Sequence, residues 1–112
     1  IAGTDVSWTN PYNFPGFGLH DELDLLVKAG LTPMEAIQAA TKNAATVLGV
    51  LDKTGTVEPG KQADLVLLDA NPLENINNTR EINAVFRAGR YLSRADLDTM
   101  LQKEETMVQY MK

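Results

Sequence analysis

The sequence has no cysteine and only one histidine among its 112 residues. The first absence excludes disulfides and thiolate metal sites and is typical of a reducing compartment, so we expect a cytoplasmic location. The second matters because a hydrolytic zinc centre generally requires several histidines. His20 alone cannot assemble such a centre.

Long apolar runs and an excess of positive charge are also missing. No run approaches the roughly 20 residues of a membrane span, and the N-terminus lacks the pattern of a signal peptide. The net charge is −5, with acidic and basic residues interspersed. We therefore expect no binding to nucleic acid or to membranes. A phosphate-binding glycine pattern and a nucleophile elbow are absent as well.

The clearest feature present is a turn that leads into an apolar strand. Pro59 and Gly60 predict a type II turn, because proline presets the φ of its second position and glycine supplies the positive φ of its third. Residues 63–68 then run without polar alternation, which predicts a strand buried on both faces. At 112 residues and 44% hydrophobic content the chain is one domain in size. The cover for this strand is expected to come partly from elsewhere.

The first residues are apolar and strand-like, and the chain begins at Ile1 rather than at methionine. We therefore expect a cut or processed piece of a longer protein. Residues 1–5 are predicted to be the end of a strand, and residues 6–17 a long loop. The aromatic side chains of this loop either line a pocket or pin the loop to the body of the protein. They are Trp8, Tyr12, Phe14 and Phe17.

Helical spacing and stop signals predict three helices in the next segment. The first covers residues 19–29 and ends at Gly30. Thr32 and Glu35 form a predicted capping box that begins the second, with proline at its first position. The third covers residues 43–48 and ends at Gly49.

The remainder is predicted to be a loop, a hairpin and a terminal helix. Residues 71–80 read as a loop, and Ala88 with Gly89 predicts a hairpin turn between residues 82–86 and 91–92. Residues 93–96 resemble a helix cap. The apolar stripe of the helix that follows comprises Leu97, Met100, Leu101, Val108 and Met111. We divide the chain into residues 1–50, 51–93 and 94–112.

Two residues are candidates for chemistry. Asp5 lies where a strand gives way to a loop, so its carboxylate either binds a metal and takes a proton or merely caps the next turn. His20 lies in the first turn of a helix, which favours a neutral, hydrogen-bonding ring; a partly exposed residue without a catalytic role is an equal alternative. The other acidic residues have structural explanations. The helix macrodipole accounts for Asp21, Glu22 and Asp24, and bonds to turn backbone account for Asp64 and Asp69.

Taken in order, these motifs resemble the C-terminal end of the amidohydrolase superfamily, in the branch of imidazolonepropionase and the Xaa-Pro dipeptidase-like enzymes. The likeness extends to about Arg90. The motifs are Gly-Thr-Asp at residues 3–5, Leu-His-Asp-Glu-Leu at 19–23, Ala-Gly-Leu-Thr-Pro-Met-Glu-Ala-Ile at 29–37, Ala-Thr-Lys-Asn-Ala-Ala at 40–45, and residues 55–69.

This resemblance implies an α/β fold in which a (β/α)8 barrel is accompanied by a small β-sandwich. Residues 1–50 would be the last barrel strand, active-site loop and helices, residues 51–93 the return strands of the sandwich, and residues 94–112 a terminal amphipathic helix. Asp5 matches the final catalytic aspartate of the family, which binds the metal and accepts a proton from the attacking water. The implied reaction is hydrolysis of a C–N bond with a divalent metal, for which zinc is expected. His20 would be a supporting residue behind the metal ligands.

The family's other metal ligands would precede residue 1, so this piece alone is expected to be inactive. Its open strand edges are expected to be covered by self-association or by pairing with the missing N-terminal part. The full enzyme would act on a small-molecule or dipeptide substrate. The alternative hypotheses are a non-catalytic interaction module and a small-molecule binder that uses residues 8–17 as a lid.

Overall fold

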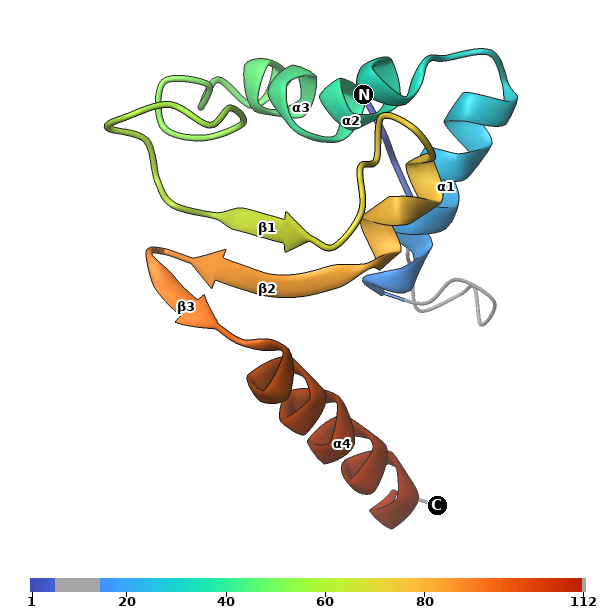
Figure 1. Cartoon of the computed structure of the whole chain (residues 1–112), viewed down its shortest axis with the longest axis vertical. Helices are drawn as coiled ribbons and strands as arrows, with labels where there is room; N and C mark the ends of the chain where they lie inside the picture. Colours follow the sequence, from blue (N-terminus) through green and yellow to red (C-terminus); the bar gives the residue numbers. More distant parts are fainter. Residues whose placement is uncertain (6–14, 112) are drawn as a thin grey trace.

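The computed structural model describes residues 1–5 and 15–111. α1 and the short helix η1 lie at one end of a small sheet, α2 and α3 lie above β1 in the view of Figure 1, and α4 extends away from the last strand. The described part of the chain contains no helix that is both long and apolar enough to cross a bilayer. The elements are α1 (Phe17–Lys28), α2 (Pro33–Ala40), α3 (Lys42–Val47), β1 (Leu65–Leu68), η1 (Ile76–Arg80), β2 (Ile82–Arg87), β3 (Arg90–Leu92) and α4 (Arg94–Tyr110).

The predicted capping box at the start of α2 is confirmed. The backbone N–H of Glu35 donates to Thr32 Oγ1 at 3.2 Å, and the N–H of Thr32 donates to Glu35 Oε2 at 2.8 Å. α3 also forms as predicted and ends before Gly49, which has a φ of +72°. Local capping signals therefore decide where these helices begin and end.

α1 begins at Phe17, two residues earlier than predicted. The acidic residues at positions 21, 22 and 24 consequently lie beyond its first turn, and the explanation by the helix macrodipole is wrong for them. Asp21 instead accepts from Arg80 at 2.8 Å, and Glu22 from the backbone N–H of Gly3 at 3.4 Å. These carboxylates fasten other segments to α1.

The sheet is antiparallel with the order β1-β2-β3. Leu65 pairs with Phe86 across β1 and β2, and Phe86 with Tyr91 across β2 and β3. The predicted hairpin is confirmed: Ala88 and Gly89 have φ values of +50° and +78°, as a type I′ turn requires. Because β1 is at the edge, one side of its backbone faces away from the sheet.

The described residues alone do not bury β1 on both faces, and the expectation that part of its cover comes from elsewhere stays a prediction. Val66 and Leu67, which point to opposite faces, are 57% and 52% exposed. An apolar run indicates that a strand is suited to burial, but the run does not show which segments cover the strand. The predicted strand at residues 1–5 is absent, because Ala2 donates its N–H to Ala39 O of α2 at 3.0 Å rather than to a neighbouring strand.

The core lies where α1, α2 and η1 meet. Its buried members are Leu23, Ala36 and Ile76. The last of these belongs to a segment predicted to be a plain loop, which is a correction: Asn75 accepts from the N–H of Asn77 at 3.0 Å and begins a 3₁₀ turn that turns Ile76 inward. Flanking apolar side chains from α1 and α2 pack around this cluster. They are Leu26, Val27, Ile37 and Ala40.

α4 follows a second capping box, in which Ser93 Oγ accepts from the N–H of Asp96 at 3.2 Å and Asp96 Oδ2 accepts from the N–H of Ser93 at 2.9 Å. The predicted terminal helix is thus confirmed. None of its 17 residues is buried, so its apolar stripe remains largely in contact with solvent.

Candidate functional site

Asp5 is the last residue described before the gap at 6–14, and its side chain is exposed. Its φ of +50° lies in the left-handed region, which aspartate tolerates better than most residues do. The segment that leads to it is attached to two helices, through the N–H of Ala2 to α2 and the N–H of Gly3 to Glu22 of α1. The structure therefore places Asp5 at the end of an anchored segment, with its carboxylate directed to solvent-accessible space.

His20 projects from α1 toward η1. Its Nδ1 lies 3.0 Å from Thr79 Oγ1, and its ring is half-buried. Burial lowers the pKa of His20 below its ordinary value, the charge of Arg80 lowers it further, and the charge of Asp21 opposes both. The ring is therefore neutral at neutral pH, in agreement with the expected hydrogen-bonding role.

A chain of charged and amide groups continues this contact along α1. Arg80 donates to Asp21 at 2.8 Å and to Asn77 Oδ1 at 3.1 Å, and Asn77 donates to Asp24 at 3.0 Å. Asp24 also pairs with Lys28 at 2.6 Å, and hydrogen bonds from Lys28 and Asn77 lower the pKa of its carboxyl. The cluster holds η1 on α1, and every charge in it has a partner; its role is structural.

A groove of about 650 Å³ lies between α1, β2 and α4. His20 and Phe17 form part of one wall, and apolar side chains of α4 form the other. The sequence did not predict this groove. The apolar stripe on α4 was the only signal for it, and a stripe on one helix does not show which other elements lie opposite. Its lining also includes Pro15, Gly16, Arg80, Ile82, Val85, Arg94, Leu97, Met100, Leu101 and Glu104.

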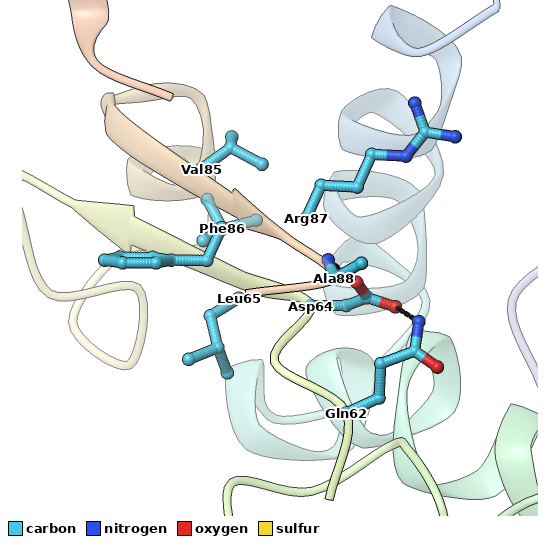
Figure 2. Close-up of a pocket in the computed structure, with 8 residues that line it drawn as sticks. Gln62, Asp64, Leu65, Val85, Phe86, Arg87 and Ala88 are labelled. Carbon is cyan, nitrogen blue, oxygen red and sulfur yellow. Dashed lines mark hydrogen bonds between the residues drawn. The ribbon is translucent and has the colours of Figure 1, made fainter. Parts of the chain in front are cut away.

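A second hollow of about 630 Å³ lies over the hairpin end of the sheet, where Figure 2 shows its lining. Asp64 is its central polar group: it accepts from the N–H of Ala88 and from Gln62 Nε2, both at 2.7 Å. The prediction that Asp64 bonds neighbouring turn backbone is wrong in its partner: the backbone that donates to Asp64 is that of Ala88, in the turn between β2 and β3. Asp69 instead accepts from the side-chain amide of Asn83 at 2.8 Å. Both carboxylates accept hydrogen bonds from other groups of this chain, so their role here is structural.

Within residues 1–5 and 15–111, no group of three or more histidine and acidic side chains could hold a metal ion. His20 contacts Thr79 of η1, whereas Asp5 is exposed at the end of the segment that Gly3 attaches to Glu22. The described residues therefore do not fit a complete catalytic metal site by themselves. Trp8, Tyr12 and Phe14 lie outside the described residues, whereas Phe17 is exposed at the groove.

Comparison with known proteins gives a family. The sequence profile of the amidohydrolase family matches residues 3–92, from the segment that carries Asp5 to the end of β3. The chain belongs to the amidohydrolase family. The match includes helices α1 to α3 and the whole sheet, and it ends before α4.

Curated relatives of this amidohydrolase chain are several times longer. It is 39% identical to an imidazolonepropionase of Thermoplasma volcanium over 76% of the chain and 20% of that protein. It is 42% identical to an ochratoxinase of Aspergillus niger over 74% of the chain and 16% of that protein. The chain thus spans about a fifth or less of these two relatives.

Solved amidohydrolase structures align with the same portion. Phenylurea hydrolase B matches with a TM-score of 0.68 and 45% identity, over 75% of this chain and 18% of that one. Molinate hydrolase matches with a TM-score of 0.69 and 32% identity, over 78% and 19%. A Xaa-Pro dipeptidase with bound methionine matches with a TM-score of 0.63 and 35% identity, over 66% of this chain and 18% of that one. The amidohydrolase chain is therefore a small α/β unit that corresponds to part of these structures.

Proposed function

We propose that this chain provides the C-terminal part of a metal-dependent amidohydrolase that hydrolyses C–N bonds in a small-molecule or dipeptide substrate. The observation that supports this most strongly is the continuous family match over residues 3–92, which includes Asp5. Relatives include an imidazolonepropionase, a phenylurea hydrolase and a Xaa-Pro dipeptidase, so the substrate class is kept broad. The proposed setting is a reducing compartment such as the cytoplasm.

Asp5 is the proposed catalytic and metal-binding residue of the chain. Its carboxylate is exposed at the end of a segment anchored to α1 and α2, which is suited to a group that must meet ligands from other residues. A divalent metal, with zinc expected, supplies an activated water in sites of this kind. Since the described residues do not hold such a metal by themselves, its remaining ligands would come from outside residues 1–112.

His20 is proposed as a supporting residue. Its neutral ring connects α1 to Thr79 of η1, and α1 also carries Glu22, which holds the N-terminal segment. The ring therefore acts on Asp5 only through the placement of α1. The open edge of β1 is proposed to pair with strands that this chain does not contain.

The experiment begins with the coding sequence upstream of Ile1, where we expect an open frame containing a His-X-His strand. Residues 1–112 alone, supplied with zinc, should not hydrolyse dipeptides, imidazolones or phenylureas. The same residues joined to the upstream part should do so, and Asp5→Asn should lower kcat/KM by about 100-fold or more, the range for loss of a positioned acid or base. Asp52→Asn, an exposed aspartate outside the proposed site, is the matched control.

Robust hydrolysis by residues 1–112 alone would contradict the proposal that activity needs further ligands. Full activity of Asp5→Asn in the joined protein would remove Asp5 from the site. If the upstream sequence contains no metal-ligand pattern, the non-catalytic alternative gains support.

That alternative is a binding module, and the groove beside Phe17 is the observation that favours it. A hollow of about 650 Å³ lined mostly by apolar groups is large enough for a small organic molecule. Fluorescence of the single tryptophan offers the cheapest readout. A saturable change on titration with a library of small apolar compounds, abolished by Phe17→Ala, would support it; no saturable change would count against it.

A further inference from the structure

α4 is the one long helix that follows the family match, which ends at residue 92. Nothing in the proposed enzymatic role uses it. Its apolar stripe is nevertheless extensive: Val108 is 53% and Met111 81% exposed. A helix that presents such a face to solvent normally packs it against another surface.

The stripe has two halves that differ in surroundings. Leu97, Met100 and Leu101 line the groove opposite Phe17 and Val85. Met107, Val108 and Met111 occupy the last turns, beyond the lining of that groove and away from the body of the molecule (Figure 1). One chain thus carries both an open apolar groove and a projecting apolar helix end.

The stripe is also symmetric about Glu104. Leu97 and Met111 each lie seven residues from it, Met100 and Val108 four, and Leu101 and Met107 three. Spacings of three, four and seven keep all these positions on one helix face. Two such helices placed antiparallel about Glu104 would therefore set apolar side chains against apolar side chains along their whole length.

We propose that two copies of this chain associate through antiparallel α4 helices, with the end of each helix filling the groove of the other. The contact is isologous: Leu97 of one copy meets Met111 of the other, and the reverse contact follows from the two-fold axis. The two Glu104 carboxylates meet near this axis, and their repulsion lowers the affinity of the contact.

The exposed area is consistent with such a partner. The chain exposes 8440 Å², whereas a folded monomer of its mass of 12.3 kDa exposes ~6,100 Å², an excess of roughly 2,300 Å². Its radius of gyration is 15.3 Å, against ~13 Å for a compact domain of this length. A stable interface buries about 800 Å² on each partner, so the excess suffices for one and leaves area for the strands proposed to pair with β1.

Sedimentation equilibrium of residues 1–112 tests the association, and a species of twice 12.3 kDa is expected. Val108→Glu places a charge on the stripe and should raise the dissociation constant by about tenfold or more. Gln109→Glu places the same charge on the neighbouring position, off the stripe, and should leave the constant unchanged. Both residues are exposed, so neither change should unfold α4, which circular dichroism can verify.

Disulfide trapping tests the register, since the chain has no cysteine of its own. With a mild oxidant that accepts the two electrons and two protons released by a thiol pair, Glu104→Cys should yield a covalent dimer. Gln102→Cys, on the opposite side of the helix, should not. Leu97→Cys mixed with Met111→Cys should yield a mixed dimer, whereas Met111→Cys alone should not.

A monodisperse monomer at about 100 μM, far above typical constants for specific pairs, would overturn the proposal. Association that Val108→Glu leaves unchanged would overturn it as well, because another surface would then be responsible. Trapping of Met111→Cys with itself would indicate parallel helices and would overturn the antiparallel arrangement. None of these outcomes depends on hydrolysis, so they separate this proposal from the enzymatic one.

Discussion

His20 connects α1 to η1 through a neutral ring, and this makes the stability of the chain depend on pH. Its pKa in the folded chain lies below the ordinary value of 6.5, mainly because of burial. The unfolded chain therefore binds the proton more readily, and the free energy of unfolding should fall as the pH drops below that value. Urea unfolding at about pH 7.5 and about pH 5.5 measures this fall.

His20→Gln should remove the pH dependence in this window while Thr79 retains a hydrogen-bonding neighbour. Asp24, Glu58 and Asp96 have lowered pKa values, so they contribute stability above their ordinary values of 3.8 to 4.5 and lose it only at lower pH. The two windows are thus separate. An unchanged slope in His20→Gln between the two pH values would show that another group is responsible.

Gly55 is a position where the backbone and its neighbours both exclude a side chain. Its φ is +100°, and an added Cβ would lie 2.6 Å from the Cβ of Ala45. Gly55→Ala should therefore destabilise the chain by about 2 to 4 kcal/mol, from strain in the left-handed region together with overpacking. Gly60→Ala is the control: its φ is +88°, but nothing lies within 4 Å of the added carbon, so a cost of only about 1 to 2 kcal/mol is expected. Equal losses in urea unfolding would contradict the steric part of this explanation.

At the level of elements, the hairpin of β2 and β3 contains a residue that fits its turn poorly. Ala88 has a φ of +50°, a region that asparagine tolerates better than alanine does. Ala88→Asn should stabilise the chain by up to about 1 kcal/mol, and its N–H can still donate to Asp64. Ala88→Val should destabilise it, because a β-branched residue resists this conformation. A change of the same sign for both variants in thermal unfolding would refute the argument.

Elements whose signals lie close together in the sequence could be predicted, whereas burial could not. Thr32 and Glu35 lie within one turn of each other, as do Ala88 and Gly89, so α2 and the hairpin follow from local chemistry. The burial of Ile76 and the exposure of Val66 do not, because both depend on which distant segments cover them. The sequence therefore predicts the local backbone conformation of these residues, but it does not predict how far each side chain is buried.

The candidate site divides in the same way. The motif at residues 3–5 predicts Asp5 as a site residue, which stays a prediction; the anchoring of its segment does not follow from the motif, because the bonds of that segment reach α1 and α2. The partner of His20 is 59 residues away in the sequence, and no spacing rule connects it to Thr79. The groove required knowledge of how α4 sits beside β2 and α1.

For the molecule as a whole, a small buried core stabilises a fold that exposes a large surface. Ile76 is 4% exposed and joins η1 to Leu23 of α1 and Ala36 of α2. Ile76→Ala should cost about 2 to 5 kcal/mol, which is a large part of the 5 to 15 kcal/mol that stabilises an ordinary domain. Leu73→Ala, at a half-exposed leucine of the same connection, should cost less than about 1 kcal/mol. Urea unfolding followed by far-ultraviolet circular dichroism measures both, and similar losses would mean that the structure does not depend on the cluster where α1, α2 and η1 meet.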